Sequence, residues 1–124
     1  MIERKLNIAI IDDEQHAIET LSYDLRESFG EKIEIVFTAT NPFEGARQVR
    51  LLKPDILFLD MMMPGLSGPE LFTLINDLEV KVVFVTAYPE LVNNERKSKN
   101  TACLLKPVSS PELEVLFTRI SQQG

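Results

Sequence analysis

Short runs of Ile, Val, Leu and Phe, separated by segments of helical period, constrain the fold of this chain most strongly. Four runs are clear and a fifth is weaker: LNIAII (6–11), IEIVF (33–37), DILFLD (55–60), VKVVFVT (80–86) and ACLLK (102–106). Three of them are continuously apolar, as strands covered on both faces must be. IEIVF partly alternates, which predicts a strand nearer an edge of the sheet.

Amphipathic helical segments lie between or after these runs. Three of these segments each place their apolar residues on one face of a helix. These residues are Ile18, Leu21, Leu25 and Phe29 in the first segment, Leu71, Phe72 and Ile75 in the second, and Leu113, Leu116, Phe117 and Ile120 in the third. Gly30 favours the end of the first helix. Asn41 and Pro42 are typical of a helix start and open a further helix over NPFEGARQVRLL. Ser110 as N-cap, followed by Pro111, predicts the start of the last helix.

The alternation of strands and helices predicts a doubly wound α/β fold. Each parallel crossover must pass over a face of the sheet, so helices should cover both faces of a parallel sheet. No repeat, linker or low-complexity segment interrupts the pattern. The chain has 124 residues, of which 44% are hydrophobic, which is enough for one core. We expect a single domain over residues 1–124, without an output domain.

The segment PELVNNERKSKNT (89–101) departs from this pattern. It should cover the sheet between the fourth and fifth strands, yet no apolar residue follows Leu91 and Val92 in it. We expect either a short, loosely held helix here, or an exposed polar face over residues 93–100 that meets another surface.

Charge and cysteine content narrow the function. The formal net charge of −6 opposes binding to a phosphate backbone, so we expect no direct nucleic acid partner. Cys103 is the single cysteine, which excludes an internal disulfide and favours a reducing compartment, the cytoplasm. No apolar run is long enough to span a membrane, and the N-terminal residues lack a signal-peptide cleavage pattern.

Polar side chains close four of the apolar runs. Asp12 and Asp13 follow the first, Asp60 ends the third, Thr86 the fourth and Lys106 the fifth. Ligands of open parallel sheets bind beyond the carboxyl ends of the strands, so these side chains should converge. Carboxylates brought together raise one another's proton affinity, whereas a divalent cation relieves their repulsion. Their oxygen atoms favour Mg²⁺ or Mn²⁺.

A lysine and a hydroxyl aimed at the same place indicate a phosphoryl group. Lys106 can neutralise one anionic oxygen, Thr86 can donate a hydrogen bond to another, and a central carboxylate can be the nucleophile. Each residue also has an ordinary explanation. An Asp pair can form a turn or cap a helix; Asp60 can be a polar loop residue, Thr86 can end a strand, and Lys106 can be solvated. The joint pattern at four strand ends favours the metal and phosphoryl interpretation.

Several other residues could be taken for metal ligands or phosphate-binding residues, but the sequence pattern does not favour these roles. His16 is typical of the surface at a helix start. The methionines at 61–63 adjoin hard oxygen ligands, so packing explains them better than a soft-metal site. Gly65 and Gly68 fit a turn, because neither nucleotide-binding glycine motif is present. Tyr88 is predicted to border the site mouth and to affect how water reaches an acyl phosphate.

Four motifs resemble the receiver domain of two-component response regulators. They are IIDDE, PDILFLDMMMPGLSGPEL, VVFVTAY and LLKP, and in this order they cover essentially the whole chain. These motifs are most similar to those of receivers that are joined to LytTR-type DNA-binding domains. The resemblance implies a flavodoxin-like receiver fold with five strands in the order 2-1-3-4-5. It also implies a partner histidine kinase that phosphorylates Asp60.

The resemblance further implies a role for each site residue. Asp13 and Asp60 would bind Mg²⁺ directly, together with the backbone carbonyl of Met62. Asp12 would act mainly through a coordinated water. Thr86 would turn towards Asp60 once that residue is phosphorylated.

Near the C-terminal end, the sequence both matches the receiver pattern and departs from it. Lys106 would pair with a phosphoryl oxygen, and the Lys106–Pro107 peptide bond would be cis. Cys103 stands three residues before the lysine, where the family usually places an aromatic residue whose rotation reports phosphorylation. Together with the polar residues 93–100, this departure predicts a changed readout at the face usually built from the fourth helix, fifth strand and fifth helix.

Three functions compete on this sequence. The favoured one is a switch in which phosphorylation of Asp60 changes a protein-binding surface. Such a switch can act as a homodimer or within a longer regulator that has a DNA-binding output domain. The second is a degenerate receiver that binds partners without phosphorylation, which Cys103 would suit. The third is a Mg²⁺-dependent phosphohydrolase, but such enzymes commonly carry an Asp where Met62 stands. We therefore expect a phosphoacceptor domain and not an enzyme.

Overall fold

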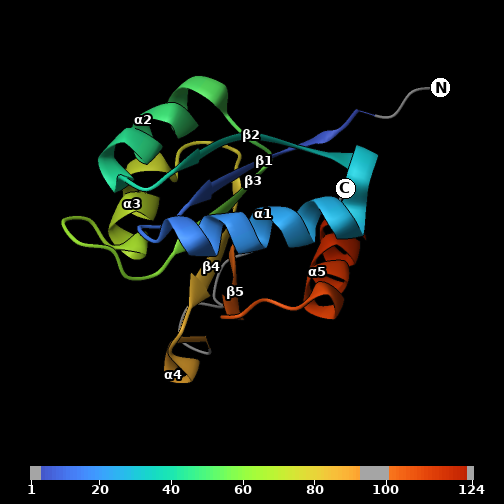
Figure 1. The fold of residues 1–124 in the computed structure, drawn as a ribbon. Coiled ribbons are helices and arrows are strands. Elements are labelled where there is room, and N and C mark those ends of the chain that lie inside the picture. Colours follow the sequence, from blue (N-terminus) through green and yellow to red (C-terminus); the bar gives the residue numbers. More distant parts are fainter. Residues whose placement is uncertain (1–3, 93–100, 123–124) are drawn as a thin grey trace.

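The computed structural model describes residues 4–92 and 101–122, which form a five-stranded parallel sheet with helices. The elements are β1 (Leu6–Ile11), α1 (Gln15–Phe29), a 3-10 turn (Gly30–Lys32), β2 (Ile33–Ala39), α2 (Pro42–Leu52), β3 (Ile56–Asp60), α3 (Gly68–Ile75), β4 (Lys81–Thr86), α4 (Pro89–Val92), β5 (Thr101–Leu105) and α5 (Ser110–Gln122). The strand order is β2-β1-β3-β4-β5, and all neighbouring strands are parallel (Figure 1). The predicted doubly wound fold and its strand order are confirmed.

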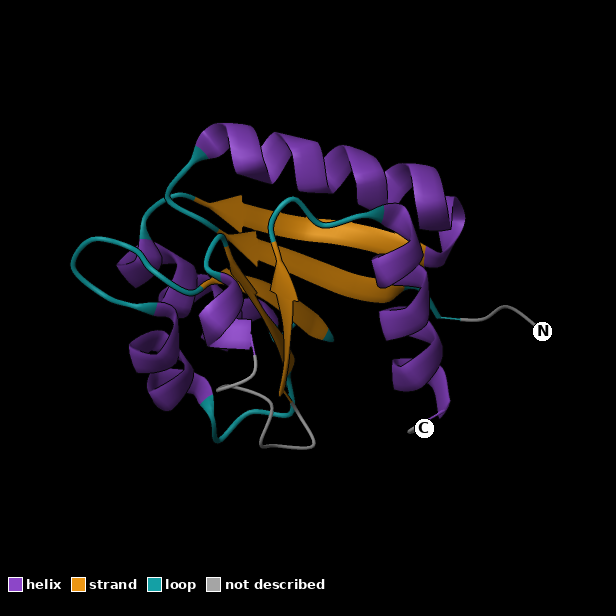
Figure 2. Ribbon diagram, turned by 90° about the horizontal axis from the view of Figure 1, so that it is seen from below, coloured by secondary structure: helices purple, strands orange, loops and turns teal. Residues whose placement is uncertain are grey.

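Helices cover both faces of this sheet, as Figures 1 and 2 show. α1 and α5 pack on the face that contains Ile8 and Ile10 of β1, whereas α2, α3 and α4 pack on the face that contains Ala9 and Ile11. The central strands β1, β3 and β4 are largely buried. β2 lies at an edge and keeps exposed residues, as its alternating pattern predicts. Within the described residues, no helix is both long and apolar enough to cross a membrane.

The ends of the elements mostly agree with the sequence pattern. Asn41 caps α2 through its side chain, and Gly30 follows α1 with a positive φ of 46°, both as predicted. β2 extends to Ala39, and β3 and β4 each begin one residue later than predicted. β5 covers Thr101–Leu105 instead of 102–106, so Lys106 follows the strand and does not end it.

The start of α5 corrects one prediction, because Ser109 and not Ser110 caps this helix. The amide of Ser109 donates to Oε1 of Glu112 at 3.1 Å, and the Ser109 hydroxyl accepts from the Glu112 amide at 3.4 Å. This reciprocal arrangement requires an acidic residue three positions after the cap, and Glu112 stands three positions after Ser109. Ser110 and Pro111 are therefore the first two helical residues.

α4 occupies Pro89–Val92 in the described part of the chain. Leu91 and Val92 pack against the core on the face that α2 and α3 also cover. These are the two apolar residues from which the sequence predicts a short helix. The predicted polar face over residues 93–100 lies outside the described residues.

Candidate functional site

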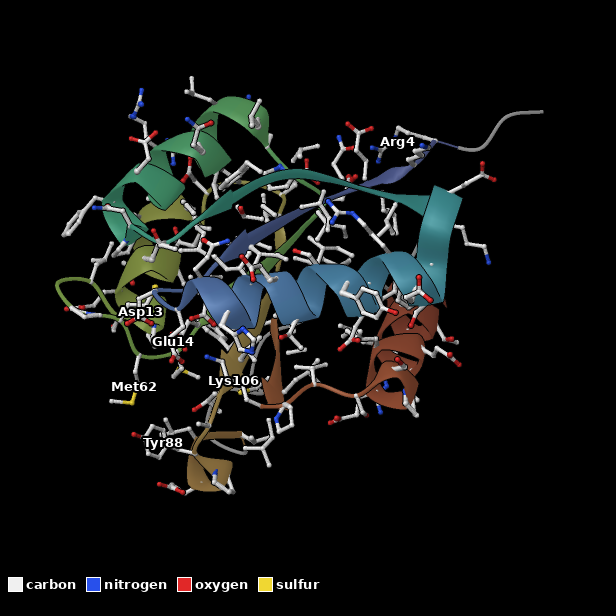
Figure 3. All side chains as sticks on the ribbon, in the orientation of Figure 1. Arg4, Asp13, Glu14, Met62, Tyr88 and Lys106 are labelled. Carbon is white, nitrogen blue, oxygen red and sulfur yellow. The ribbon has the colours of Figure 1, made fainter. Side chains whose placement is uncertain are left out.

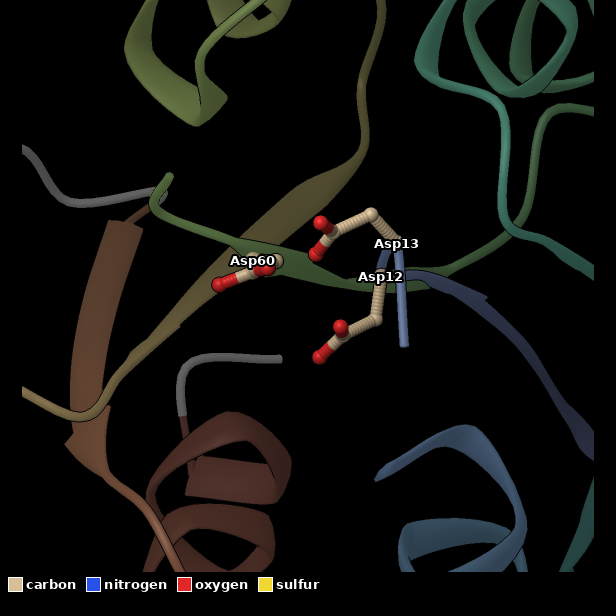
Figure 4. A group of neighbouring side chains, drawn as sticks. All are labelled: Asp12, Asp13 and Asp60. Carbon is tan, nitrogen blue, oxygen red and sulfur yellow. The ribbon is translucent and has the colours of Figure 1, made fainter. Parts of the chain in front are cut away.

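Three aspartates meet at the carboxyl end of the sheet, as Figure 4 shows. Asp12 and Asp13 directly follow β1, and Asp60 is the last residue of the adjacent strand β3. One carboxylate oxygen from each aspartate lies within 4.8 Å of those of the other two. Asp12 and Asp60 are buried, with 5% and 7% of their surface exposed, whereas Asp13 is exposed. The predicted convergence of the three carboxylates is confirmed.

Backbone hydrogen bonds between neighbouring strands continue past the strand ends and position these residues. The amide of Asp12 donates to the carbonyl of Ala39 in β2 at 3.1 Å. The amide of Lys106 donates to the carbonyl of Thr86 in β4 at 2.7 Å, and the residue after Asp60 donates to β4 in the same way. Because each residue is fixed by an adjacent strand, the sheet itself sets the spacing of the site.

Lys106 neutralises part of the negative charge of the cluster. Its Nζ lies 2.8 Å from Oδ2 of Asp12 and 3.5 Å from Oδ1 of Asp60. The other oxygen of Asp12 accepts a hydrogen bond from the Glu14 amide at 2.9 Å. Burial lowers the pKa of Lys106, but the hydrogen bond with Asp12 and the charges of both aspartates outweigh burial and raise the pKa overall. The lysine is therefore held in its charged form.

The pKa of Asp60 is raised to about 7, and burial of the carboxyl group is the largest cause. The charge of Asp12 and a hydrogen bond with Asp13 add to this rise, whereas the charge of Lys106 and the backbone amide of Met62 oppose it. One lysine among three carboxylates leaves the cluster short of positive charge. A divalent cation relieves such repulsion, and an all-oxygen donor set suits Mg²⁺ or Mn²⁺. The cluster can therefore hold a metal ion.

Thr86 ends β4 in the interior, with 1% of its surface exposed. Its hydroxyl oxygen accepts a hydrogen bond from the amide of Tyr88 at 3.1 Å. The hydroxyl thus links the site to the chain that enters α4, a contact that the sequence did not predict. The Tyr88 side chain is exposed, and its predicted effect on water stays a prediction.

The remaining residues that the sequence singled out are also placed. Figure 3 shows the labelled residues Asp13, Glu14, Met62, Tyr88 and Lys106 at one end of the molecule, with Arg4 at the opposite end. The Met62 side chain is 55% exposed, whereas its two methionine neighbours are buried in the core, so packing explains those two neighbours.

Several of the other predictions concern residues around this site. His16 is exposed at the start of α1. Gly65 has a φ of +86°, which fits its predicted place in a turn. The Lys106–Pro107 peptide bond is cis, as the resemblance implies. Cys103 is buried in β5 opposite Phe84, and its effect on the readout stays a prediction.

Gly68 has a structural role that sequence reasoning missed. Its amide donates to the carbonyl of Met61 at 2.9 Å, which brings the start of α3 against the end of β3. A Cβ atom at Gly68 would lie 2.5 Å from the backbone oxygen of Asp60. The sequence explained this glycine only as a turn residue, because a glycine at a helix start does not reveal which backbone approaches it.

Comparison with known proteins gives one family. Residues 8–118 match the family model described as the response regulator receiver domain. An uncharacterized response regulatory protein of Vibrio cholerae is 38% identical over 119 residues, which cover 95% of this chain and 49% of that protein. The transcriptional regulatory protein BtsR of Escherichia coli K12 is 35% identical with the same coverage of both chains. The chain thus spans about half the length of these relatives.

Solved structures share the fold at lower sequence identity. The REC domain of AraT, a response regulator from Geobacillus stearothermophilus, is similar with a TM-score of 0.80 and 21% identity, over 97% of this chain and 95% of that one. A two component response regulator from Cytophaga hutchinsonii is similar with a TM-score of 0.81 and 19% identity, over 96% and 99%.

Proposed function

The chain belongs to the response regulator receiver family, and from this membership we propose that it is a phosphorylation-activated switch of two-component signalling. The proposed acceptor is Asp60, and the proposed donor is a phosphohistidine of a partner histidine kinase. One observation carries this proposal: a buried carboxylate at a strand end has a charged lysine and two further carboxylates around it. Phosphorylation then shifts an existing equilibrium and changes a protein-binding surface.

The proposed transfer is a displacement at phosphorus. An oxygen of Asp60 forms a bond to phosphorus while the bond to the donor's imidazole nitrogen breaks, and the product is an acyl phosphate. Asp13, Asp60 and the Met62 carbonyl would hold Mg²⁺ directly, and Asp12 would act through a coordinated water; the ion would neutralise charge at the phosphoryl oxygens. Lys106 is charged and lies 3.5 Å from Asp60, so it can pair with another of these oxygens.

Thr86 is proposed to couple the acceptor to α4. Its hydroxyl accepts from the Tyr88 amide in this structure, and it can donate its own proton to a phosphoryl oxygen on Asp60. If Thr86 turns towards Asp60 to make that bond, its hydroxyl moves away from the Tyr88 amide, and this movement transfers the change at Asp60 to the β4–α4 connection. This route does not need an aromatic residue at position 103.

The proposed partners follow from the family and from its longer members. We propose that a histidine kinase phosphorylates this domain in the cytoplasm. Because the chain spans about half of relatives such as BtsR, we further propose that it works with a DNA-binding output domain in a longer protein. A LytTR-type output domain and pairing of two receivers stay predictions.

Metal removal tests the proposed function directly. We expect the chain to gain one phosphoryl group, seen as an increase in intact mass, when it is incubated with acetyl phosphate and Mg²⁺. Chelation with EDTA should reduce the rate to background, because the carboxylates then repel the incoming phosphoryl group. A chain that gains no mass with Mg²⁺ would instead be a degenerate receiver, and steady turnover of aryl phosphates would indicate a phosphohydrolase.

The raised pKa of Asp60 predicts a pH dependence of stability. A carboxyl group with a pKa of about 7 in the folded chain binds its proton more tightly than in the unfolded chain. Its contribution to the free energy of unfolding therefore falls as pH rises from about 4 to about 7, in the absence of metal. We expect Asp60→Asn to be less sensitive to this change when urea unfolding is compared at about pH 5 and about pH 8. Parallel pH profiles for the two proteins would contradict the prediction.

Substitution of Thr86 tests its proposed coupling role. We expect Thr86→Val to slow phosphorylation by acetyl phosphate about tenfold or more, because it removes a donor to the phosphoryl group. The same change leaves the Tyr88 amide without its acceptor, so hydrogen exchange at this amide should become faster before any phosphorylation. Thr86→Ser keeps the hydroxyl and should restore both measurements. Equal rates for the Val and Ser variants would exclude a role for the hydroxyl.

A further inference from the structure

A cavity of about 300 Å³ lies beside the aspartate cluster, between α1 and the chain that follows β5. Most of its lining is apolar, and the lining residues outside the cluster include Ala17, Leu21, Phe58, Val85, Pro107 and Val108. A volume of this size is at the lower end of the range for small-molecule sites. The proposed phosphoryl transfer uses only the end of the cavity that Asp12, Asp60 and Lys106 form.

The polar groups of the cavity favour a cation over an anion. Asp12 and Asp60 belong to the proposed Mg²⁺ site, so Asp24 is the lining carboxylate that remains available to a ligand. Lys106 already contacts carboxylates at 2.8 and 3.5 Å and is the group that would pair with a phosphoryl oxygen. An anionic ligand in the apolar part of the cavity would meet repulsion from Asp24.

Asp24 is the group that can anchor such a cation. It lies on α1 one turn beyond Thr20, which also lines the cavity, and its side chain is half-buried. No hydrogen bond or ion pair joins the Asp24 side chain to the residues in the described ranges 4–92 and 101–122. A partly desolvated carboxylate without a partner gains most from a charged hydrogen-bond donor.

We propose that this cavity binds a small organic cation, an ammonium group on an aromatic or branched aliphatic body. The ammonium pairs with Asp24, and the apolar body lies against Leu21, Phe58 and Val108.

Benzylamine is a suitable probe for this site, with benzyl alcohol as its neutral analogue and phenylacetate as its anionic one. We expect benzylamine to bind the full chain with a Kd of about 1 mM, because a molecule with few non-hydrogen atoms can gain only limited binding free energy. Benzyl alcohol and phenylacetate should bind at least about tenfold more weakly. The readout is the shift of backbone amide signals by NMR, which should be largest at Ala17, Leu21 and Val108. Shifts confined to other surfaces, or equal binding of benzyl alcohol, would overturn the proposal.

Matched variants distinguish a specific contact with Asp24 from a general effect of negative charge on α1. Asp24→Asn should weaken benzylamine binding about tenfold, as the loss of one charge-assisted contact predicts. Glu27→Gln removes the same charge from an exposed position of α1 outside the cavity and should leave binding unchanged. Ala17→Leu fills the cavity and should abolish binding, while a dispersed amide spectrum shows that it folds. Equal weakening by the Asp24 and Glu27 changes would refute the anchor.

This test does not depend on phosphorylation of Asp60. Benzylamine binding is measured in the unphosphorylated chain, so its failure leaves the proposed switch untouched. Conversely, a chain that binds benzylamine but gains no phosphoryl group would fail only the proposed switch.

Discussion

Replacing Asp60 with asparagine is expected to reduce phosphorylation by acetyl phosphate about 100-fold or more, to background. The amide lacks the anionic oxygen that attacks phosphorus. The neighbouring carboxylates are poor substitutes. Asp12 is held by Lys106 at 2.8 Å and by the Glu14 amide at 2.9 Å, and Asp13 is exposed to solvent. Intact mass after incubation with Mg²⁺ and acetyl phosphate measures the effect.

A second Asp→Asn change controls for the loss of charge alone. Asp77 is exposed beyond the end of α3, where it pairs with Arg50 at 2.9 Å, far from the strand ends that form the site. Asp77→Asn should therefore gain mass at the wild-type rate. If Asp60→Asn gains mass as fast as Asp77→Asn, the acceptor is a different residue. Asp60→Asn should also remain folded, because it removes a source of repulsion from Asp12.

The fold could be predicted because the apolar residues recur along the sequence with the periods of strands and helices. The apolar runs that became β1, β3 and β4 are too hydrophobic to have an exposed face, so a doubly covered parallel sheet is required. The strand order could not be predicted in this way, because the same pattern of apolar residues is compatible with many strand orders. That order was implied only by the resemblance, which rests on the site motifs.

The start of α5 shows how the choice between adjacent residues can be made. Both Ser109 and Ser110 are good N-cap residues, and Pro111 fits either the first or the second helical position. Only the reciprocal hydrogen bonds with Glu112 distinguish them, since they require an interval of three residues. The sequence therefore does identify the N-cap residue, but through the position of Glu112 and not through the two serines.

The site was predictable as a set of residues but not as a set of contacts. Parallel strands end at one edge, so Asp12, Asp60 and Lys106 had to come near one another. The sequence could not show that Lys106 lies closer to Asp12 than to Asp60, because a shift of less than 1 Å in a long side chain decides it. The bond between the Thr86 hydroxyl and the Tyr88 amide likewise depends on how the chain leaves β4.

Gly68→Ala is expected to impair the site through the backbone and not through any side chain of the cluster. The added Cβ would lie 2.5 Å from the carbonyl oxygen of Asp60 and 3.0 Å from the Cα of Met61. Both are backbone atoms, so they cannot rotate away as the end of a flexible side chain would. Either α3 moves outward or the end of β3 shifts. We expect a loss of about 1–3 kcal/mol in the free energy of unfolding, which urea titration measures.

The same shift should weaken the site, because Asp60 and the Met62 carbonyl adjoin the displaced backbone. We expect Mg²⁺ affinity and the phosphorylation rate to fall about tenfold or more. Ser67→Ala is the matched control: it removes the capping box of α3, at a cost of about 1 kcal/mol, without placing an atom against β3. If Gly68→Ala lost stability but bound Mg²⁺ as tightly as Ser67→Ala, the close approach of α3 would serve packing alone. A loss of Mg²⁺ affinity only in Gly68→Ala would mean that this glycine sets the position of the acceptor.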